Sequence, residues 1–565
     1  MKELTDSVYG FADLRQGKYL YVDKTEYIWK LIQPYKSMYF LSRPRRFGKS
    51  LMVSTLKAIF EGRKELFDGL AIAEKEYDWK PYPVIHLSFG DYSVVSDAVK
   101  ELPEYLLVKL QEIASAYSIT LTKPTPGLCF GELIDALAKN EQVVILVDEY
   151  DKPILDNITH PQIEQLQRIL KGFFSVLKER NAKERFLFIT GVSKFCHVSL
   201  FSDLNNLTDI TMHRDYATMF GYTQSELEHY FSDRIETTAQ AQNIPVDELK
   251  RKLKAWYDGY CFEETSETVY NPVSIAKFFE NDGKFDNYWF ATGTPSFLME
   301  LAKKTDFNFE DAVSRAVPGV TFDAFEISNI DPVTLLLQTG YLTIKSSEIR
   351  FNKRWFWLDF PNEEVAESFS TYLLNSYVGR TQREVSSFSA DLATAFLEDN
   401  LNQARKVLES FFAGVPYTIH KKSEATFQSI FYAIFRLLGF NIEAESCTND
   451  GRIDAVVQTD DHIYLFEFKL DDDDTALSQI KEKAHFKKYL QSSKKITLIG
   501  VNFDSEKGQL IDWQTCSRLP DRNDQICIVS KSNIPATVDI KKASFSNYVR
   551  NKRLFFAETG IIPFH

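Results

Sequence analysis

The chain has 565 residues, of which 44% are hydrophobic and 14% aromatic, so it can bury several cores and is long enough for three or four domains. Its longest apolar stretches are of strand length, far below the roughly 18 residues that a membrane-spanning helix needs, so we expect no membrane segment. Residues 1–17 lack the apolar run of a secretory or transit peptide, and we therefore expect a cytoplasmic location.

Cysteine spacing and charge exclude some protein classes and leave others open. Six cysteines are scattered without a CxxC pair, which argues against a zinc ribbon and against a disulfide framework. The net charge of −13 is unusual for a nucleic-acid-binding protein, because phosphate contacts draw on lysine and arginine. The acidic excess lies in the first 400 residues, whereas residues 401–565 hold 22 Lys and Arg against 21 Asp and Glu. The net charge of the whole chain therefore does not predict the electrostatic potential around the C-terminal part.

The first 220 residues alternate short apolar segments with helical patterns, which is typical of a parallel α/β sheet. We expect strands at residues 37–42, 83–89, 143–147 and 186–190. The pattern then turns helical and aromatic, which predicts a lid or helical extension. Residues 326–365 read as a helix followed by two strands, compatible with a small winged helix that either packs internally or contacts DNA. Further helices lead to Gly414 and Pro416, where we place the last boundary.

A phosphate-binding motif follows the first expected strand. Residues 42–50 read SRPRRFGKS, which is the P-loop pattern GxxxxGK[ST] except that Arg43 occupies the position of the first glycine. Backbone N–H groups at Gly48 and the helix start would face phosphates, Lys49 would reach the terminal phosphates, and Ser50 would hold Mg²⁺. Taken alone, the motif is equally compatible with a basic surface loop.

A second motif, VVILVDEYD, strengthens this interpretation. Asp148 ends a buried strand, where it would contact Mg²⁺ through water, and Glu149 would orient or deprotonate the attacking water. The alternative, that both are polar residues ending a strand, is less favoured with a P-loop about a hundred residues upstream. Arg45 and Arg46 lie beside the expected phosphates and would either bind the γ-phosphate or act as an arginine finger in cis.

The C-terminal part carries a third pattern, in which Asp454 opens an apolar strand and the strand IYLFEFKL follows a short turn. The strand period of two places Glu467 and Lys469 on one face. Asp454 and Glu467 would converge on one or two Mg²⁺ ions at a scissile phosphate, while Lys469 would orient or help deprotonate the water. The structural alternative is an ion pair between Glu467 and Lys469.

These segments resemble a known family. DLRQGKYLYVDKTEYI, LSRPRRFGKSL, ILVDEYDKPI, FITGVSKF and YDGYCF…VYNP are similar to the AAA-ATPase-like family of prokaryotic proteins that carry a C-terminal PD-(D/E)xK domain. The resemblance covers most of the chain, and in that family an arginine-rich P-loop is the rule. It implies that Glu424, at the start of a helix, completes the metal shell and that Gln479, on the helix after the ExK strand, supports the site. Asp258, Gly259 and Tyr260 match a family motif for which the sequence offers no physical account.

The expected fold is α/β: a P-loop domain at 1–220, a helical lid at 221–325, a winged-helix-like connector at 326–413 and a restriction-endonuclease-like domain at 414–565. The expected function is an ATP-binding, Mg²⁺-dependent nuclease controlled by nucleotide. The alternative is a nucleotide-switched regulatory or DNA-binding protein with a non-cleaving nuclease fold. ATP and Mg²⁺ are the expected cofactors, nucleic acid (DNA above all) is the expected partner, and a homo-oligomer is compatible with the sequence.

Overall fold

A computed structural model describes the chain at residues 2–5, 8–158, 160–194, 200–201, 204–290, 312–313, 315–322, 331–378, 381–413, 424–438, 441–448, 451–471, 476–482, 486, 489, 492–504, 509–518 and 528–531.

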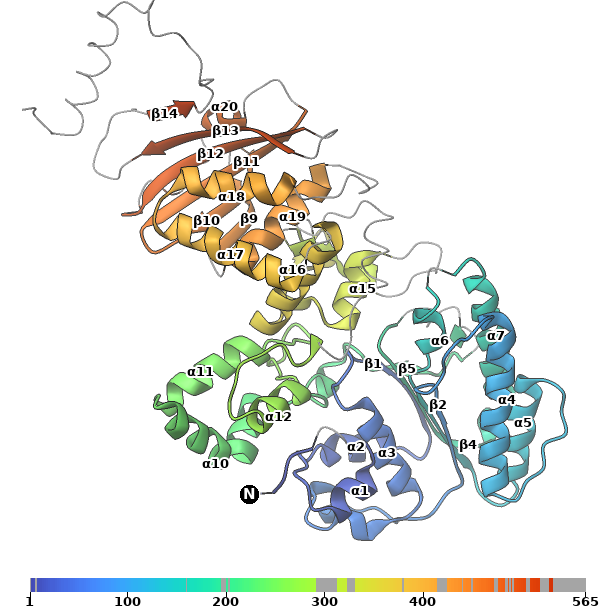
Figure 1. Ribbon diagram of the computed structural model, residues 1–565. Coiled ribbons are helices and arrows are strands. Elements are labelled where there is room, and N and C mark those ends of the chain that lie inside the picture. Colours follow the sequence, from blue (N-terminus) through green and yellow to red (C-terminus); the bar gives the residue numbers. More distant parts are fainter. Residues whose placement is uncertain are drawn as a thin grey trace, which may run out of the picture.

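The N-terminal domain is built on a five-stranded parallel sheet (Figure 1). Its strand order is β2-β3-β4-β1-β5, so that β4 lies between β1 and β3. Parallel sheets are covered on both faces, which explains why β3 and β4 are buried along their whole length. The four expected strands are confirmed, and the short β5 joins them; the bounds are β1 (Ser37–Ser42), β2 (Val84–Ser88), β3 (Val143–Asp148), β4 (Glu184–Gly191) and β5 (Thr208–Asp209).

Helices cover both faces of this sheet. Because successive side chains of a strand point to opposite faces, Leu146 and Phe188 pack in one core with α1 to α3, whereas Val147 and Ile189 pack in another with α4, α5, α7 and α8. The helices are α1 (Phe11–Gln16), α2 (Thr25–Ile32), α3 (Lys49–Phe60), α4 (Ala98–Ala116), α5 (Pro126–Leu137), α6 (Lys152–Leu155), α7 (Ile163–Phe174) and α8 (Val176–Arg180). Short 3₁₀ turns are η1 (Lys64–Phe67), η2 (Ala71–Glu74), η3 (Asn181–Lys183) and η4 (Arg214–Tyr216).

A helical lid follows the sheet domain and has a small core of its own. It comprises α10 (Gln224–Gln242), α11 (Val246–Tyr257) and α12 (Pro272–Glu280). Thr223 and Glu226 form a capping box that begins α10, and Asn271 caps α12, whose first residue is Pro272. Val22 from the N-terminal segment belongs to the lid core, so the beginning of the chain is packed against the lid.

The middle of the chain contains the expected helix and hairpin. Helix α15 (Pro332–Thr339) starts at the Asp331 cap and ends at Gly340, whose φ of 89° suits a glycine terminator. It precedes the antiparallel hairpin of β7 (Thr343–Arg350) and β8 (Lys353–Asp359), and β6 (Val317–Pro318), which precedes the turn η6 (Gly319–Phe322), pairs with the other edge of β8. We call this hairpin the wing.

The C-terminal domain is a six-stranded mixed sheet with helices on both faces (Figure 1). Strand order is β14-β13-β12-β11-β10-β9, and only β11 and β12 are parallel among the pairs of this sheet that the structure describes. The strands are β9 (Asn441–Thr448), β10 (Gly451–Gln458), β11 (His462–Leu470), β12 (Lys495–Asp504), β13 (Gln509–Arg518) and β14 (Ile528–Lys531). The helices are α16 (Glu363–Val378), α17 (Gln382–Leu397), α18 (Leu401–Ala413), α19 (Glu424–Leu437) and α20 (Ala476–Glu482).

The helices divide between the two faces of this sheet. Phe396, Phe412 and Phe435, from α17, α18 and α19, pack with Phe466 and neighbouring strand residues on one face. Helix α20 packs on the other face with Val456, Leu465 and Leu498. The expected α/β architecture is therefore confirmed in both end domains. No helix among the described residues is long and apolar enough to cross a membrane.

The Asp258-Gly259-Tyr260 motif joins the lid to the middle of the chain. Gly259 has a φ of 101°, and a Cβ at this position would lie 2.0 Å from the carbonyl oxygen of Pro361. Asn362 donates its side-chain amide to the carbonyl of Asp258 at 2.8 Å, and the ring of Tyr260 lies 4.8 Å from that of Phe47 in the P-loop. The motif is therefore a tight joint between lid, P-loop and the segment before α16, and glycine is required by both conformation and space.

Replacing Gly259 by alanine should destabilise the protein strongly. The new methyl group would meet the Pro361 carbonyl, and alanine is strained at this φ, so we expect a loss of about 2–4 kcal/mol in the free energy of unfolding. The matched control is Gly69→Ala, because Gly69 also has a positive φ (75°) but its Cβ would meet nothing within 4 Å. The control should lose about 1 kcal/mol. Equal losses of both variants in chemical denaturation would contradict this account.

Candidate nucleotide and nuclease sites

The P-loop connects β1 to α3 as the motif requires. Gly48 has a φ of 91° and Arg46 a φ of 69°, so the loop makes a tight left-handed turn before the helix begins at Lys49. The Lys49 side chain is buried, and its Nζ donates to the carbonyls of Arg43 and Pro44, each at 3.0 Å. Burial lowers the pKa of Lys49, and the nearby carboxylates of Asp148 and Glu149 oppose that shift. The loop thus holds its lysine head group in place by its own carbonyls.

Arg43, the departure from the glycine pattern, is a structural residue. Arg43 is 1% exposed, and its guanidinium donates to the carbonyls of Ser42, Thr211 and Tyr216 at 2.9, 2.6 and 3.2 Å. It also lies 4.2 Å from the centre of the Phe262 ring. Burial lowers the pKa of Arg43 to about 9, which still leaves it charged at neutral pH. Arg43 therefore fastens the loop to the segment leading into the lid and points away from the phosphate side of the loop.

Acidic residues gather where β3 ends. Asp148 is 3% exposed and Ser50 hydrogen-bonds to it, while its Oδ1 has no hydrogen-bond partner in the described part of the chain. Glu149 has a φ of 55°, an unusual conformation for this residue type that turns the chain away from the strand. Burial raises the pKa of Asp148 and of Glu149, and in Glu149 the charge of Asp148 raises it further. Lys49, Ser50 and the two carboxylates are thus brought together from segments a hundred residues apart.

Asp151 has a different role from these two acids. It is buried, and its carboxylate accepts hydrogen bonds from the backbone N–H of Val192 and Ser193 and from the Ser193 hydroxyl at 2.8 Å. Asp151 therefore fixes the chain that leaves β4 beside the P-loop. The sequence pattern did not predict that the role of Asp151 differs from that of Asp148 and Glu149.

A cavity of about 450 Å³ opens above the P-loop. Its polar end is formed by Arg45, Arg46, Gly48, Lys49, Ser50 and Glu149. The other end is mostly apolar and comes from the N-terminal segment and the lid, including Tyr9, Tyr21, Phe220, Tyr222 and Val273. Arg46 donates to the Tyr9 hydroxyl at 2.9 Å, so a P-loop cation and the N-terminal segment meet across the opening. A polar end beside an apolar end matches a ligand with a charged group and a flat, less polar group.

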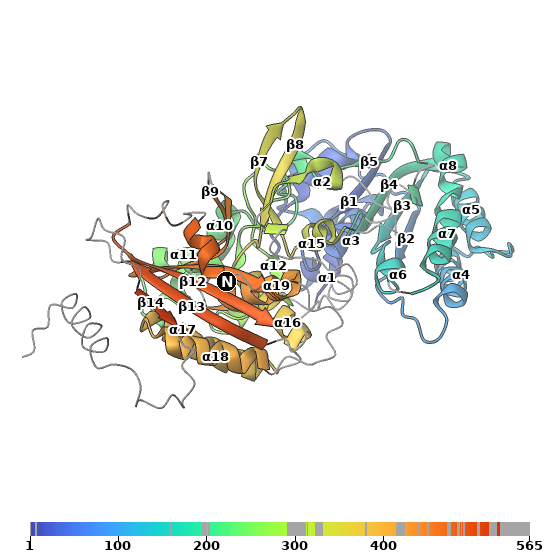
Figure 2. The same ribbon diagram turned by 90° about the horizontal axis from the view of Figure 1, so that it is seen from above.

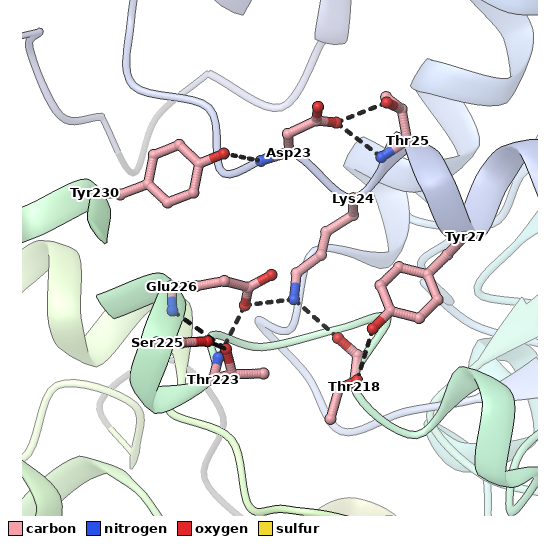
Figure 3. Close-up of polar contacts among 9 residues, drawn as sticks. All are labelled: Asp23, Lys24, Thr25, Tyr27, Thr218, Thr223, Ser225, Glu226 and Tyr230. Carbon is pink, nitrogen blue, oxygen red and sulfur yellow. Dashed lines mark hydrogen bonds and ion pairs between the residues drawn. The ribbon is translucent and has the colours of Figure 1, made fainter. Parts of the chain in front are cut away.

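Lys24 links the cavity wall to the lid (Figure 3). Its Nζ donates to Glu226 at 2.6 Å and to the carbonyl of Thr218 at 2.8 Å, and Tyr27 hydrogen-bonds to the Thr218 hydroxyl. Burial lowers the pKa of Lys24, and the Glu226 carboxylate opposes the shift. Glu226 is also the capping-box residue of α10, so this ion pair fixes where the lid begins. Sequence reasoning missed Lys24, although a lysine and an aspartate inside the apolar run YLYVDKTEYI were a usable signal.

Restoring the missing P-loop glycine by Arg43→Gly should destabilise the protein without improving nucleotide binding. The change leaves the buried carbonyl of Thr211 without its Arg43 donor, removes one of two donors to the Tyr216 carbonyl and removes the packing on Phe262, so we expect a loss of about 3 kcal/mol or more. Thermal unfolding and nucleotide titration would measure the two effects. The control Arg46→Gly relieves a positive φ and should leave stability nearly unchanged. An Arg43→Gly variant as stable as the parent would contradict the structural role.

In the C-terminal domain, Glu467 and Lys469 lie on the α20 face of β11. Glu467 is 3% exposed and Lys469 is half-buried. Glu467 pairs in register with Gly500 of β12, and a Cβ on Gly500 would lie 2.3 Å from the backbone nitrogen of Leu477. The absence of a side chain at Gly500 thus lets the start of α20 approach the sheet directly beside Glu467.

The register of the sheet also places Asp454. Ala455 of β10 is opposite Phe466 of β11, and this antiparallel register, continued by one residue, brings position 454 level with position 467 on the same face. Gln479 belongs to α20, on this face, whereas α19, which begins at Glu424, packs on the other. The side chains of Asp454, Gln479 and Glu424 lie outside the described residues, so their roles stay predictions. Among the side chains that the structure does describe, no group of three or more His, Cys, Asp or Glu could hold a metal.

A chain of hydrogen bonds leads from the P-loop toward the C-terminal domain. The indole N–H of Trp289 donates to the carbonyl of Arg45 at 3.0 Å, and the backbone N–H of Trp289 donates to Glu364 at 2.6 Å. The hydroxyl of Ser274, on α12 of the lid, donates to the other oxygen of Glu364 at 2.7 Å. Glu364 is fully buried in the first turn of α16, and burial raises the pKa of Glu364 to about 7. Helix α16 in turn packs against α19. P-loop, lid and C-terminal domain therefore meet at Trp289 and Glu364.

Comparisons with known proteins agree with this architecture. A family described as "Predicted AAA-ATPase" matches residues 7–201, and one described as "PD-(D/E)XK nuclease superfamily" matches residues 422–513. A protein from Azotobacter chroococcum mcd 1, described as "Uncharacterized protein in vnfD 5'region", is 36% identical over 526 residues, which is 91% of this chain and 98% of that protein. The likeness therefore extends through both matched domains and the segments between them.

Proposed function

Because this chain belongs to the AAA-ATPase-like proteins that carry a C-terminal PD-(D/E)XK nuclease-superfamily domain, we propose that it hydrolyses phosphodiester bonds of DNA under the control of bound ATP. The observation that carries the proposal is that the buried Glu467 and the half-buried Lys469 lie on one face of β11, level with position 454 of β10. A buried carboxylate and a lysine two residues apart on one strand face are the arrangement that the match to the nuclease superfamily leads us to expect beside a metal ion.

ATP would bind with its phosphates on the P-loop and its base in the apolar end of the cavity. The backbone at Gly48 and the start of α3 would surround the phosphates, and Lys49, Arg45 and Arg46 would neutralise them. Mg²⁺ would be held between Ser50 and Asp148, because the buried Oδ1 of Asp148 has no hydrogen-bond partner among the described residues. Glu149 would accept a proton from the attacking water, and its raised pKa makes it a better base than an exposed glutamate.

The nuclease site would use the α20 face of the C-terminal sheet. Asp454 and Glu467 would hold Mg²⁺, and Gln479 would support the site from α20. Glu424 is left out of this metal shell, because α19 packs on the other face of the sheet. When bound, Mg²⁺ lowers the pKa of a coordinated water and polarises the scissile phosphate. Lys469 would orient the attacking water and stabilise the negative charge that develops on the phosphate.

Control by nucleotide would pass through Trp289 and Glu364. A ligand that shifts the backbone at Arg45 changes the acceptor of the Trp289 indole, and Trp289 shares Glu364 with Ser274 of the lid. Because Glu364 lies in the first turn of α16 and α16 packs against α19, a movement of this cluster would reach the C-terminal domain. This mechanism requires the contacts among Trp289, Glu364 and Ser274 to differ between the nucleotide-bound and nucleotide-free forms.

Lys469→Ala should abolish cleavage while leaving nucleotide binding intact. With plasmid DNA, Mg²⁺ and ATP, we expect the cleavage rate to fall by about 100-fold or more, because the variant loses a positioned cation at the reacting phosphate. The control is Lys406→Ala, an exposed lysine on α18 on the other face of the sheet, which should cut normally.

The same assay tests the other half of the proposal. Lys49→Ala should lose phosphate release from ATP and the effect of ATP on cleavage, with the nuclease residues untouched. If the parent protein cuts no DNA or RNA with Mg²⁺ or Mn²⁺ under any nucleotide condition, the nuclease proposal fails. Nucleotide binding with negligible turnover would then favour a nucleotide-switched protein that does not cleave.

Trp289→Phe should uncouple the two sites. The ring of Trp289 lies 5.1 Å from that of Tyr341. Phenylalanine keeps an aromatic ring at this place, but it cannot donate a hydrogen bond to the Arg45 carbonyl. We expect the ratio of cleavage rates with and without ATP to move toward unity by about fivefold or more, with ATP affinity little changed. Trp256→Phe on α11 is the control, because its ring contacts Phe285 and takes no part in the cluster. An unchanged ratio in the Trp289 variant would exclude this route.

A further inference from the structure

The tip of the wing has a phenylalanine in a turn that requires positive φ. Strands β7 and β8 are joined by Phe351 and Asn352, with Arg350 and Lys353 as the last cross-strand pair. Both loop residues have positive φ, 50° and 60°, which is the conformation of a type I′ turn. Such turns prefer asparagine or glycine, and a bulky aromatic residue with positive φ is strained. Folding of the hairpin alone therefore gives no reason for phenylalanine at position 351.

The same side chain is also poorly placed with respect to water. Phe351 is 94% exposed and Ile349 is 72% exposed, and Figure 2 shows the wing extending beyond the elements around it. Exposed single apolar residues are common, but here exposure coincides with strain in the same residue. A residue that is costly in both respects is expected where it contacts something outside the chain.

Cations surround the apolar tip. Arg350 and Lys353 face each other across the hairpin, and Arg354 follows. Arg350 pairs with Glu348 at 2.6 Å and Arg354 pairs with Glu264, whereas Lys353 forms no ion pair with another described residue. The cross-strand register also places Trp355 and Trp357 on the face of Arg350 and Lys353, and both rings are half-buried. In a chain with a net charge of −13, a projecting hairpin with three cations and one acid near its tip is a local exception.

We propose that the tip of the wing binds double-stranded DNA, with Phe351 entering the minor groove and Arg350, Lys353 and Arg354 contacting the flanking phosphates. The minor groove of B-DNA is about 6 Å wide, which is too narrow for the two-stranded ribbon but admits the single ring at its tip, and phenylalanine is among the apolar residues that proteins insert between base pairs there. The wide, shallow minor groove of an RNA duplex gives such a tip no comparable enclosure. The inference rests on the proposed function in taking DNA as the substrate, and it adds a contact outside the residues proposed for catalysis.

Phe351→Asn tests this inference because it improves the turn while removing the ring. Asparagine suits a positive φ, so the thermal unfolding midpoint should stay equal or rise slightly. The affinity for a fluorescent 30-base-pair DNA duplex, measured by anisotropy in EDTA with and without ATP, should fall about tenfold. Lys353→Ala should weaken binding and reduce the slope of log affinity against log salt by about 1. Tyr35→Asn, which removes another aromatic side chain that is 80% exposed, is the control and should bind as the parent does.

Binding in EDTA is measured without cleavage, so this inference and the nuclease proposal can fail separately. Weaker binding by Phe351→Asn in a parent protein that binds but does not cut would support the wing contact and reject the nuclease. Unchanged binding by Phe351→Asn and Lys353→Ala, or a parent that binds no duplex, would overturn the wing contact whatever the cleavage assay shows. A change of oligomeric state in light scattering with DNA affinity unchanged would instead identify the tip as a contact between protein chains.

Discussion

A buried arginine sets the geometry on which the nucleotide site depends. Removing the Arg43 guanidinium from water is expensive, and the cost is offset only because three backbone carbonyls and an aromatic ring surround it. Two of those carbonyls, from Thr211 and Tyr216, belong to the segment that leads into the lid. The P-loop can therefore take this shape only with that segment in place, and Lys49 is positioned in turn by the carbonyls of Arg43 and Pro44. A glycine at position 43 would make a loop of similar shape possible but would leave it unattached.

Other residues of the P-loop also contact distant parts of the chain. Phe47 contacts Tyr260 of the glycine joint, and the carbonyl of Arg45 accepts the indole N–H of Trp289. Residues 43, 45 and 47 of the loop thus contact the segment before the lid, the cluster around Glu364 and the Asp258-Gly259-Tyr260 joint, respectively. These neighbours also contact one another, because the Phe262 ring lies against both Arg43 and Phe47 and the Tyr260 ring lies against Trp289. Because Glu364 is buried with its oxygens hydrogen-bonded to Trp289 and Ser274, that cluster has little freedom to rearrange without breaking a buried polar contact. Such contacts favour discrete alternative arrangements over gradual deformation.

Sequence patterns predicted the parts of the structure that depend on local chemistry. The apolar run before Asp148, the loop ending at Gly48 and the alternation around Glu467 each reflect a period or a turn that neighbouring residues determine, and the family resemblance extended this to the order of domains. The role of Arg43 was not predictable, because its partners lie about 170 residues away in sequence. Trp289 was missed for the same reason, since nothing local marks an indole that bonds to a P-loop carbonyl. The strands β12 to β14 were also not anticipated, because the expected site ended at the helix that follows β11. The positions of Asp454, Glu424 and Gln479 were predicted as backbone elements, but their side chains lie outside the described residues.

The distant partners of Arg43 also fix when the nucleotide site can form during synthesis. At a translation rate of about 5–20 residues per second, roughly 8 to 35 seconds separate the appearance of Arg43 from that of Thr211 and Tyr216. Strand β4, the direct neighbour of β1, is likewise made only after β2, β3 and the helices between these strands. During that interval the guanidinium stays hydrated and the P-loop segment lacks its fixed shape. In a nascent chain the P-loop can therefore take this shape only after the sheet and the entry to the lid have emerged, so the cavity above the loop is enclosed late in synthesis.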